Sequence, residues 1–282
     1  MKWGIDVSRW QGNFNFDKAK AEGVEFAILK AGGGDSGLYQ DKAFERNYVL
    51  ASSMMPVGAY FFGCAMDTNQ AMKEASYFCQ LIQGKTFPMK VWYDVEAKML
   101  KAPNLALVVI TFIERVRAAG YECGIYASES TLKTLCKNEA IAKYPHWTAR
   151  WTKTPPSIPT EIWQFGGETN LIRSNKVAGV TCDQNYLMDN TEVITPTPTT
   201  PAPKPNTQEE YNMPTIKRGS KGKAVKIWQI ILGITADGVF GPISETATKK
   251  WQSQHLDVDG KKLVADGIVG ARTWKVALSM LK

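Results

Sequence analysis

Asp94 and Glu96 stand two residues apart at the end of an otherwise apolar run, Val91-Trp-Tyr-Asp-Val-Glu96. Because side chains alternate across a β-strand, both carboxylates are expected on one face, about 6.5 to 7 Å apart along the strand. Two carboxylates that share a solvent-filled cleft push their pKa values apart, so that one stays protonated and the other charged. Cleavage of a glycosidic bond needs such a proton donor beside a negative charge. The alternative is a structural pair that binds Lys or Arg on the rim of a barrel.

Two further aspartates stand in the first and last expected strands. Asp6 ends the first, in Gly4-Ile-Asp-Val-Ser-Arg-Trp-Gln-Gly12, and Asp183 lies in the last, in Val180-Thr-Cys-Asp-Gln-Asn-Tyr186. First and last strands become neighbours when a barrel closes. We therefore expect Asp6 and Asp183 to join Asp94 and Glu96 in one acidic cleft.

Aromatic residues cluster near the same expected strand ends, and flat rings stack on the faces of sugars. Ordinary packing of the core and rim is the alternative explanation for at least half of them. The aromatic residues that we expect to contact a substrate are Tyr60, Phe62, Tyr126, Trp151 and Trp163.

The rest of the sequence argues against a metal centre or another nucleophile. The only histidines are His146 and His255, and the five cysteines form no CxxC pair, so a zinc site is not expected. An odd number of cysteines fits reduced, mostly buried thiols. The run 31–35, Ala-Gly-Gly-Gly-Asp, lacks the Lys-Ser/Thr of a phosphate-binding loop and is expected to be a flexible connection from strand to helix. We expect no metal and no cofactor.

Residues 1–194 alternate short β-rich runs with helical patterns, which is typical of α/β proteins. Eight strands in fewer than 200 residues predict a compact, irregular β/α (TIM-like) barrel, whose chemistry should lie at the C-terminal strand ends. The expected strands are 3–7, 25–31, 57–62, 89–95, 123–127, 146–151, 161–165 and 180–186. The clearest expected helices are 41–53, 69–82 and 104–119.

Residues 195–205 contain a proline at nearly every second position, and residues 195–210 are predicted to form an extended linker. Residues 211–282 then change to a helical period and contain two similar turns, Ala236-Asp-Gly-Val-Phe-Gly241 and Ala265-Asp-Gly-Ile-Val-Gly270. Because Asp-Gly favours a tight turn, this segment predicts a small all-α domain of three helices.

The formal net charge of +7 is placed unevenly along the chain. Residues 1–194 contain 21 Lys/Arg against 20 Asp/Glu, whereas residues 211–282 contain 12 against 5. The basic C-terminal segment indicates a polyanionic partner. A bacterial cell wall and nucleic acid both fit this charge.

These motifs give residues 1 to about 192 a specific resemblance to glycoside hydrolase family 25, the Chalaropsis-type lysozymes of phage endolysins and bacterial autolysins. The resemblance implies that Glu96 is the general acid, that Asp94 is its partner, and that Asp6 and Asp183 are supporting acids. It also implies peptidoglycan as substrate, cut at the β-1,4 bond between N-acetylmuramic acid and N-acetylglucosamine. The matching stretches are 4–12, 26–31, 56–62, 91–96, 124–126, 162–165 and 181–186.

One stretch departs from the family pattern. The chain reads Ala31-Gly-Gly-Gly-Asp35 where family members commonly read Ala-Thr-Glu-Gly, which affects the subsite near Lys30. Lys30 is also expected to contact the substrate. The resemblance implies a retaining muramidase, in which either Asp94 attacks directly or it orients the 2-acetamido group of the substrate as nucleophile.

Residues 214–282 resemble the three-helix peptidoglycan-binding domain. The resemblance implies that this segment holds the enzyme on the wall and makes nucleic acid the weaker interpretation of its charge. The matching stretches are 217–225, 228–229, 237–242, 251–252 and 266–270.

No apolar run approaches the length of a membrane span, and no signal peptide is recognised at the start. We therefore expect an endolysin that is made in the host cytoplasm and acts on the wall after release, without a membrane partner. Two alternatives stay open: a non-catalytic wall-binding protein with a decayed barrel, and a chitinase-like hydrolase.

Overall fold

The structure of the chain is a computed structural model that describes residues 1–189, 214–257 and 261–279. It divides into two compact units, Met1–Ala202 and Pro203–Lys282. The expected linker, residues 195–210, lies outside the described residues. In the described part of the chain, no helix has the length and apolar character needed to cross a membrane.

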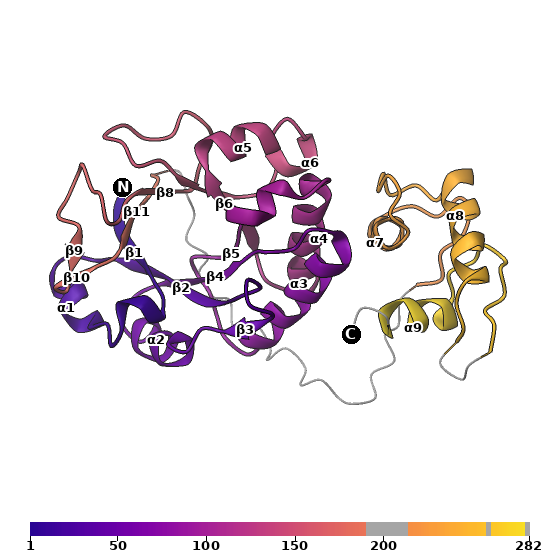
Figure 1. Cartoon of the computed structure of the whole chain (residues 1–282), viewed down its shortest axis with the longest axis horizontal. Coiled ribbons are helices and arrows are strands. Elements are labelled where there is room, and N and C mark those ends of the chain that lie inside the picture. The colour runs from indigo at the N-terminus through magenta and orange to yellow at the C-terminus, as the bar shows by residue number, and fades with distance from the viewer. Residues whose placement is uncertain (190–213, 258–260, 280–282) are drawn as a thin grey trace. The chain divides into compact units, whose positions relative to one another are not determined.

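Within residues 1–189, eight strands close into a mixed barrel (Figure 1). Their order is β1-β11-β8-β7-β6-β5-β4-β2, and β1 pairs with β2 to complete the ring. The predicted irregular β/α barrel is therefore confirmed. The strands are β1 (Lys2–Val7), β2 (Phe26–Gly33), β4 (Val57–Phe62), β5 (Val91–Asp94), β6 (Cys123–Ser128), β7 (His146–Ala149), β8 (Ile162–Gly166) and β11 (Asp183–Leu187).

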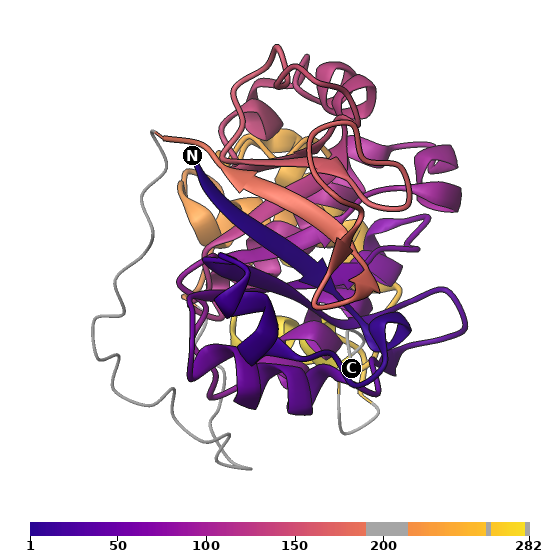
Figure 2. The ribbon, with the colours of Figure 1, turned by 90° about the vertical axis from the view of Figure 1, so that its left-hand side faces the viewer.

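The last strand departs from a purely parallel barrel. β11 runs antiparallel to both of its neighbours, β1 and β8, and Figure 2 shows β1 and β11 side by side. The expected strand 180–186 is divided, because Val180 and Thr181 form β10 (Val180–Thr181), which pairs with β9 (Lys176–Val177). The expected flexible connection at 31–35 is also partly wrong. β2 continues to Gly33 and pairs there with β3 (Tyr39–Gln40).

The helices of the first unit cover the outside of the barrel (Figure 1). α4 buries Val108, Phe112 and Val116 along one face, as the predicted helical period requires. Phe112 stacks on Tyr93 of β5 with ring centroids 3.6 Å apart, and so ties α4 to the strand that carries Asp94. The helices are α1 (Phe16–Ala21), α2 (Phe44–Ser52), α3 (Thr68–Ile82), α4 (Leu105–Ala118), α5 (Glu129–Leu135) and α6 (Glu139–Ala142), with short 3-10 helices η1 (Arg9–Gln11) and η2 (Ala97–Lys101).

Alternation along the strands divides the apolar side chains into two clusters. The larger cluster joins outward-facing strand residues to the helices. The smaller contains no helix residue and fills the barrel interior. Its members are Phe26, Ile28, Met89, Trp92, Trp147, Ile162 and Leu187, with Tyr60 and Tyr126 packed against them. The barrel is therefore filled by aromatic rings, and the polar inward-facing residues lie at its rim.

In the described parts of the second unit, 214–257 and 261–279, three helices surround a small core centred on Trp228 and Trp274. They are α7 (Lys223–Ile231), α8 (Pro242–Ser253) and α9 (Ala271–Ser279). The two Asp-Gly turns are built alike, as their sequences predict. The side-chain oxygen of Gln229 accepts from the Gly238 amide at 2.8 Å, and that of Gln252 accepts from the Gly267 amide at 2.9 Å.

Candidate active site

The four predicted carboxylates meet at one rim of the barrel. Asp6 and Asp94 lie near the C-terminal ends of the parallel strands β1 and β5, and Glu96 follows β5. Asp183 is the first residue of β11, which runs the opposite way and therefore begins at the same rim. Asp6 and Asp183 are direct partners in the β1–β11 register, so their side chains project from neighbouring positions. The predicted convergence of these residues is thus seen in the structure.

Asp6 is buried and held by two amides. Its Oδ2 accepts from Nδ2 of Asn185 at 2.8 Å and from Nε2 of Gln164 at 3.1 Å. Burial raises the pKa of Asp6 to about 6, although both hydrogen bonds act in the opposite direction. Burial thus favours the protonated form of Asp6, and the two amides favour the charged form.

Asp183 faces Asp6 without comparable support. Burial, followed by the charges of Asp6 and Glu96, raises the pKa of Asp183 to about 8. Burial and mutual repulsion therefore favour a pair that keeps a proton over one in which both carboxylates are charged.

Asp94 and Glu96 form the second acidic pair. The chain stays extended at Glu96, with φ −148° and ψ −170°, and Val95 between them is buried in the outer cluster. Asp94 and Glu96 therefore share the inner face, as predicted. Burial and the neighbouring Glu96 raise the pKa of Asp94 well above its usual range, and burial raises that of Glu96, while Lys30 lowers both. Oδ1 of Asp94 is buried and has no hydrogen-bond partner among the described residues.

Four of the predicted substrate contacts line the barrel interior around these acids. The Lys30 ammonium lies 4.7 Å from the ring centroid of Phe62 and 5.7 Å from that of Tyr60. The Tyr126 ring lies 4.4 Å from that of Trp147. Burial, together with nearby carboxylates, raises the pKa of the Tyr60 and Tyr126 hydroxyls, so both stay protonated and can donate hydrogen bonds.

Trp151 lies on the rim. It is 42% exposed, and its indole N–H donates to Oε1 of Gln164 at 3.1 Å. Trp151 is therefore placed where a ring could stack on a sugar.

Trp163 is not part of this cleft, and the expectation that it contacts a substrate is wrong. It is 2% exposed, packs against Phe165 and Tyr186, and donates its indole N–H to the Arg150 carbonyl. The reason is strand alternation. Trp163 faces the outer cluster, so Gln164 faces inward.

Gln164, Asn185 and Trp147 are site residues that the sequence reasoning missed. All three are buried next to the acids, and Trp147 donates to Oδ1 of Asn185 at 2.8 Å. The alternation of side chains along a strand could have identified Asn185. It lies two residues after Asp183 on β11, so both side chains must be on the same face.

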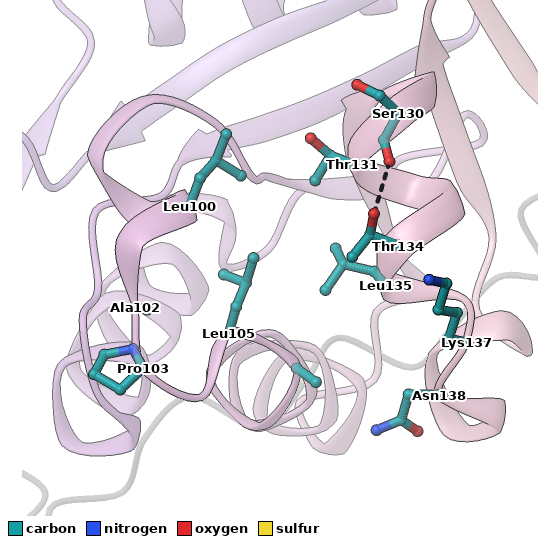
Figure 3. Close-up of a pocket in the computed structure, with 11 residues that line it drawn as sticks. Leu100, Ala102, Pro103, Leu105, Ser130, Thr131, Thr134, Leu135, Lys137 and Asn138 are labelled. Carbon is teal, nitrogen blue, oxygen red and sulfur yellow. Dashed lines mark hydrogen bonds between the residues drawn. The ribbon is translucent and has the colours of Figure 1, made fainter.

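A groove of about 830 Å³ lies between η2, the start of α4, and α5 (Figure 3). None of its lining residues is a carboxylic acid, so it lacks the acid that cleavage of a glycosidic bond needs. The close-up shows the Thr134 hydroxyl bonded to Ser130 along one wall. The lining is otherwise mostly aliphatic, through Leu100, Ala102, Pro103, Leu105, Ala106 and Leu135.

The five cysteines are free thiols. Cys64, Cys123 and Cys182 are buried and the other two are half-buried, in line with the expected reduced thiols. Among the described residues, no group of three or more His, Cys, Asp or Glu side chains has the arrangement of a metal site.

The model of Glycosyl hydrolases family 25 matches residues 5–172, a range that includes Asp6, Asp94 and Glu96 and ends before Asp183. The chain is 28% identical over 213 residues to lysozyme M1 of Streptomyces globisporus, across 67% of this chain and 71% of that protein. It is 25% identical over 256 residues to the autolytic lysozyme of Clostridium acetobutylicum, across 89% and 72%. The crystal structure of the CTP1L endolysin is similar with a TM-score of 0.57 and 26% identity, covering 67% of each chain.

Proposed function

The chain belongs to Glycosyl hydrolases family 25 and is a lysozyme that acts on peptidoglycan, and we propose that Glu96 and Asp94 carry out its reaction. The bond cut is the β-1,4 bond between N-acetylmuramic acid and N-acetylglucosamine. One observation carries the assignment of residues. Four carboxylates meet at one rim of the barrel, and two of them, Asp94 and Glu96, share the end of one strand.

Glu96 acts as general acid. It is only partly buried, so a glycosidic oxygen can approach it, and burial raises its pKa, which favours the protonated form that a general acid needs. After the first step, the same carboxylate takes a proton from the incoming water.

Asp94 supports the positive charge that develops at the sugar ring. Its buried Oδ1 has no partner among the described residues, which is the state expected of an acceptor that awaits a donor from the substrate. The amide N–H of the 2-acetamido group can be that donor. A hydrogen bond from it would favour the ionised form of Asp94, so that a proton held by the Asp94–Glu96 pair would lie on Glu96. This supports the acetamido-assisted path over direct attack by Asp94. A sugar covalently attached to Asp94 after trapping with a 5-fluoro glycoside that keeps the 2-acetamido group would contradict it.

The test of the reaction is mass spectrometry of the soluble fragments released from purified peptidoglycan. Glu96→Gln should release none while keeping its circular dichroism and melting temperature, because only the proton donor is lost. Glu114→Gln, the same change on α4, is the matched control and should behave as wild type.

Each outcome separates one alternative. New reducing ends on N-acetylmuramic acid, absent with Glu96→Gln, support the proposal. Reducing ends on N-acetylglucosamine overturn the bond named here, and faster cleavage of chitin than of wall indicates the chitinase-like alternative. Wall binding without any release by the wild type indicates a non-catalytic protein.

The second unit is proposed to hold the enzyme on the wall. Residues 211–282 contain 12 Lys/Arg against 5 Asp/Glu, and the side chains of Lys226, Lys250 and Lys275 are exposed. A basic surface attracts anionic wall polymers and raises the concentration of the barrel near its insoluble substrate.

We also propose an endolysin role, which the likeness to the CTP1L endolysin supports. In this role the protein is made inside the host and reaches the wall through a separate pore. Cells that express it should lyse only when a pore-forming protein is co-expressed. Lysis without the pore would contradict this role.

A further inference from the structure

Two buried amides beside the acidic cleft have their orientation fixed by tryptophan. The Trp151 indole and the Tyr126 hydroxyl both donate to Oε1 of Gln164, at 3.1 and 2.9 Å. The Trp147 indole donates to Oδ1 of Asn185 at 2.8 Å. An indole N–H can only donate, so the atom that it meets must be the amide oxygen.

The fixed oxygens force both amide NH₂ groups toward the same acceptor. Nε2 of Gln164 and Nδ2 of Asn185 lie 3.1 and 2.8 Å from Oδ2 of Asp6. Neither amide can turn to offer its oxygen to Asp6 without losing the hydrogen bond from its indole N–H. Oδ2 of Asp6 therefore accepts two hydrogen bonds from donors that cannot turn away. If Oδ2 carried a proton, that proton would face an NH₂ group and not an acceptor.

We propose that Gln164 and Asn185 are positioning residues that keep Asp6 as the anion of the Asp6–Asp183 pair and leave the shared proton on Asp183. The inference rests on the proposed function, because it explains how two of its four acids divide their roles. Asp183 receives no comparable donor from the described residues, and its carboxyl is left free to offer a proton to the substrate.

Other charged and titratable groups surround Asp6 and Asp183. They also influence the proton affinity of Asp6. Glu96 after β5 raises the affinity of Asp6 for a proton, and Asp6 and Glu96 both raise that of Asp183 on β11. Lys30 on β2 acts in the opposite direction on the neighbouring Asp94 and Glu96. The remaining groups around the pair are Asp94, Glu168, Tyr60, Tyr126 and Cys182.

The experiment compares the pH dependence of kcat/KM on soluble glycan fragments for wild type, Gln164→Met and Asn185→Leu. Each variant removes one donor from Asp6. The affinity of Asp6 for a proton should rise, and the acid limb of the profile should move up by about one pH unit, a roughly tenfold loss on the acid side. Gln164→Glu keeps an acceptor for Trp151 and Tyr126 but adds a negative charge, and should move the limb at least as far.

Gln184→Met is the matched control. Gln184 is equally buried on β11 and also accepts an indole N–H, from Trp3 at 3.2 Å. It pairs with Ile5 in register and so faces the outer cluster, away from Asp6. Its replacement should cost stability comparable to Gln164→Met and leave the acid limb in place.

A second measurement does not depend on activity. The side-chain carboxyl of Asp6, labelled with ¹³C and assigned by its loss in Asp6→Asn, is titrated by NMR in wild type and Gln164→Met. A higher midpoint in the variant supports the inference, and equal midpoints together with coincident acid limbs overturn it. If Glu96→Gln keeps its turnover, the proposed function fails, while the NMR titration still decides the role of Gln164.

Discussion

At the scale of single residues, the cleft concentrates groups that burial makes costly to ionise. Asp6 and Asp94 are 5% and 4% exposed. Of these two, only Asp6 accepts hydrogen bonds from side chains of the described residues, and these bonds offset the cost of burying its charge and hold the carboxylate in place. Such a cluster is poor for stability and useful for chemistry, because the proton held at neutral pH is available for transfer. The free energy of unfolding should therefore depend on pH through these carboxylates.

Asp183→Asn should stabilise the protein at neutral and mildly alkaline pH. The pKa of Asp183 is about 8 in the folded protein and about 4 in the unfolded chain, so between these values only the folded state holds the proton. The free energy of unfolding contributed by this group consequently falls as pH rises from about 4 to about 8. The amide removes that loss, and we expect a gain on the order of 1 to 2 kcal/mol at pH 8, with reduced activity.

Urea unfolding of wild type and Asp183→Asn at pH 5 and pH 8 measures this effect. The gain should be larger at pH 8 than at pH 5. An equal difference at the two pH values would show that Asp183 does not titrate as described.

At the scale of elements, the position of Asp94 depends on how closely β4 and β5 approach at their ends. The Gly63 amide, just after β4, donates to the Asp94 carbonyl at 2.9 Å. Glu74 of α3 joins the same region by accepting from the Cys64 amide at 3.0 Å and from the Tyr93 hydroxyl at 2.7 Å. The outer layer thus fixes the backbone from which the inner acids project.

Gly63→Ala should reduce both stability and activity. A Cβ at this position would lie 2.7 Å from the Tyr93 ring, 2.8 Å from the Asp94 carbonyl oxygen and 2.8 Å from the Met99 sulfur. Because two of these neighbours belong to β5, relief of the clash displaces Asp94. We expect about 1 to 3 kcal/mol of destabilisation and a loss of kcat larger than the change in KM.

The control is Gly241→Ala in the second unit, where a Cβ meets nothing within 4 Å. Thermal unfolding and steady-state kinetics of the two variants make the comparison. Normal kcat in Gly63→Ala would show that the approach of β4 to β5 does not position the acid.

At the scale of the whole molecule, charge and chemistry are divided between two units. The acidic cleft belongs to the first unit, and nearly all of the excess positive charge belongs to the second. The second unit is itself built around two equivalent turns, in which Gln229 and Gln252 each bind the turn glycine amide. Division of this kind predicts that binding to the wall and catalysis respond to different substitutions.

Lys250→Glu with Lys275→Glu should weaken wall binding about tenfold at low salt and leave kcat on soluble fragments unchanged, because charge in the second unit attracts the wall but does not touch the reacting bond. The difference should shrink as salt screens the charges. The pair Lys250→Arg with Lys275→Arg keeps the charge and serves as control. Sedimentation with purified walls at several salt concentrations gives the affinity, and equal binding by both pairs would reject an electrostatic anchor.

The barrel strands and the four acids could be predicted because their signals are local. A strand end is marked by a few neighbouring residues, and alternation places Asp94 with Glu96 without reference to the rest of the chain. The order of the strands then follows from closure of the ring, which brings the first strand beside the last.

The sequence by itself thus determined the barrel, its acidic rim and the basic second segment. The tertiary structure alone decided that β11 runs antiparallel, that Trp163 faces outward, and that Gln164 and Asn185 hold Asp6. The physical reason is distance along the chain. The hydrogen bonds from the Gln164 and Asn185 amides to Asp6 join residues that are 158 and 179 positions apart in the sequence. They are buried, and therefore strong, only once the barrel has closed.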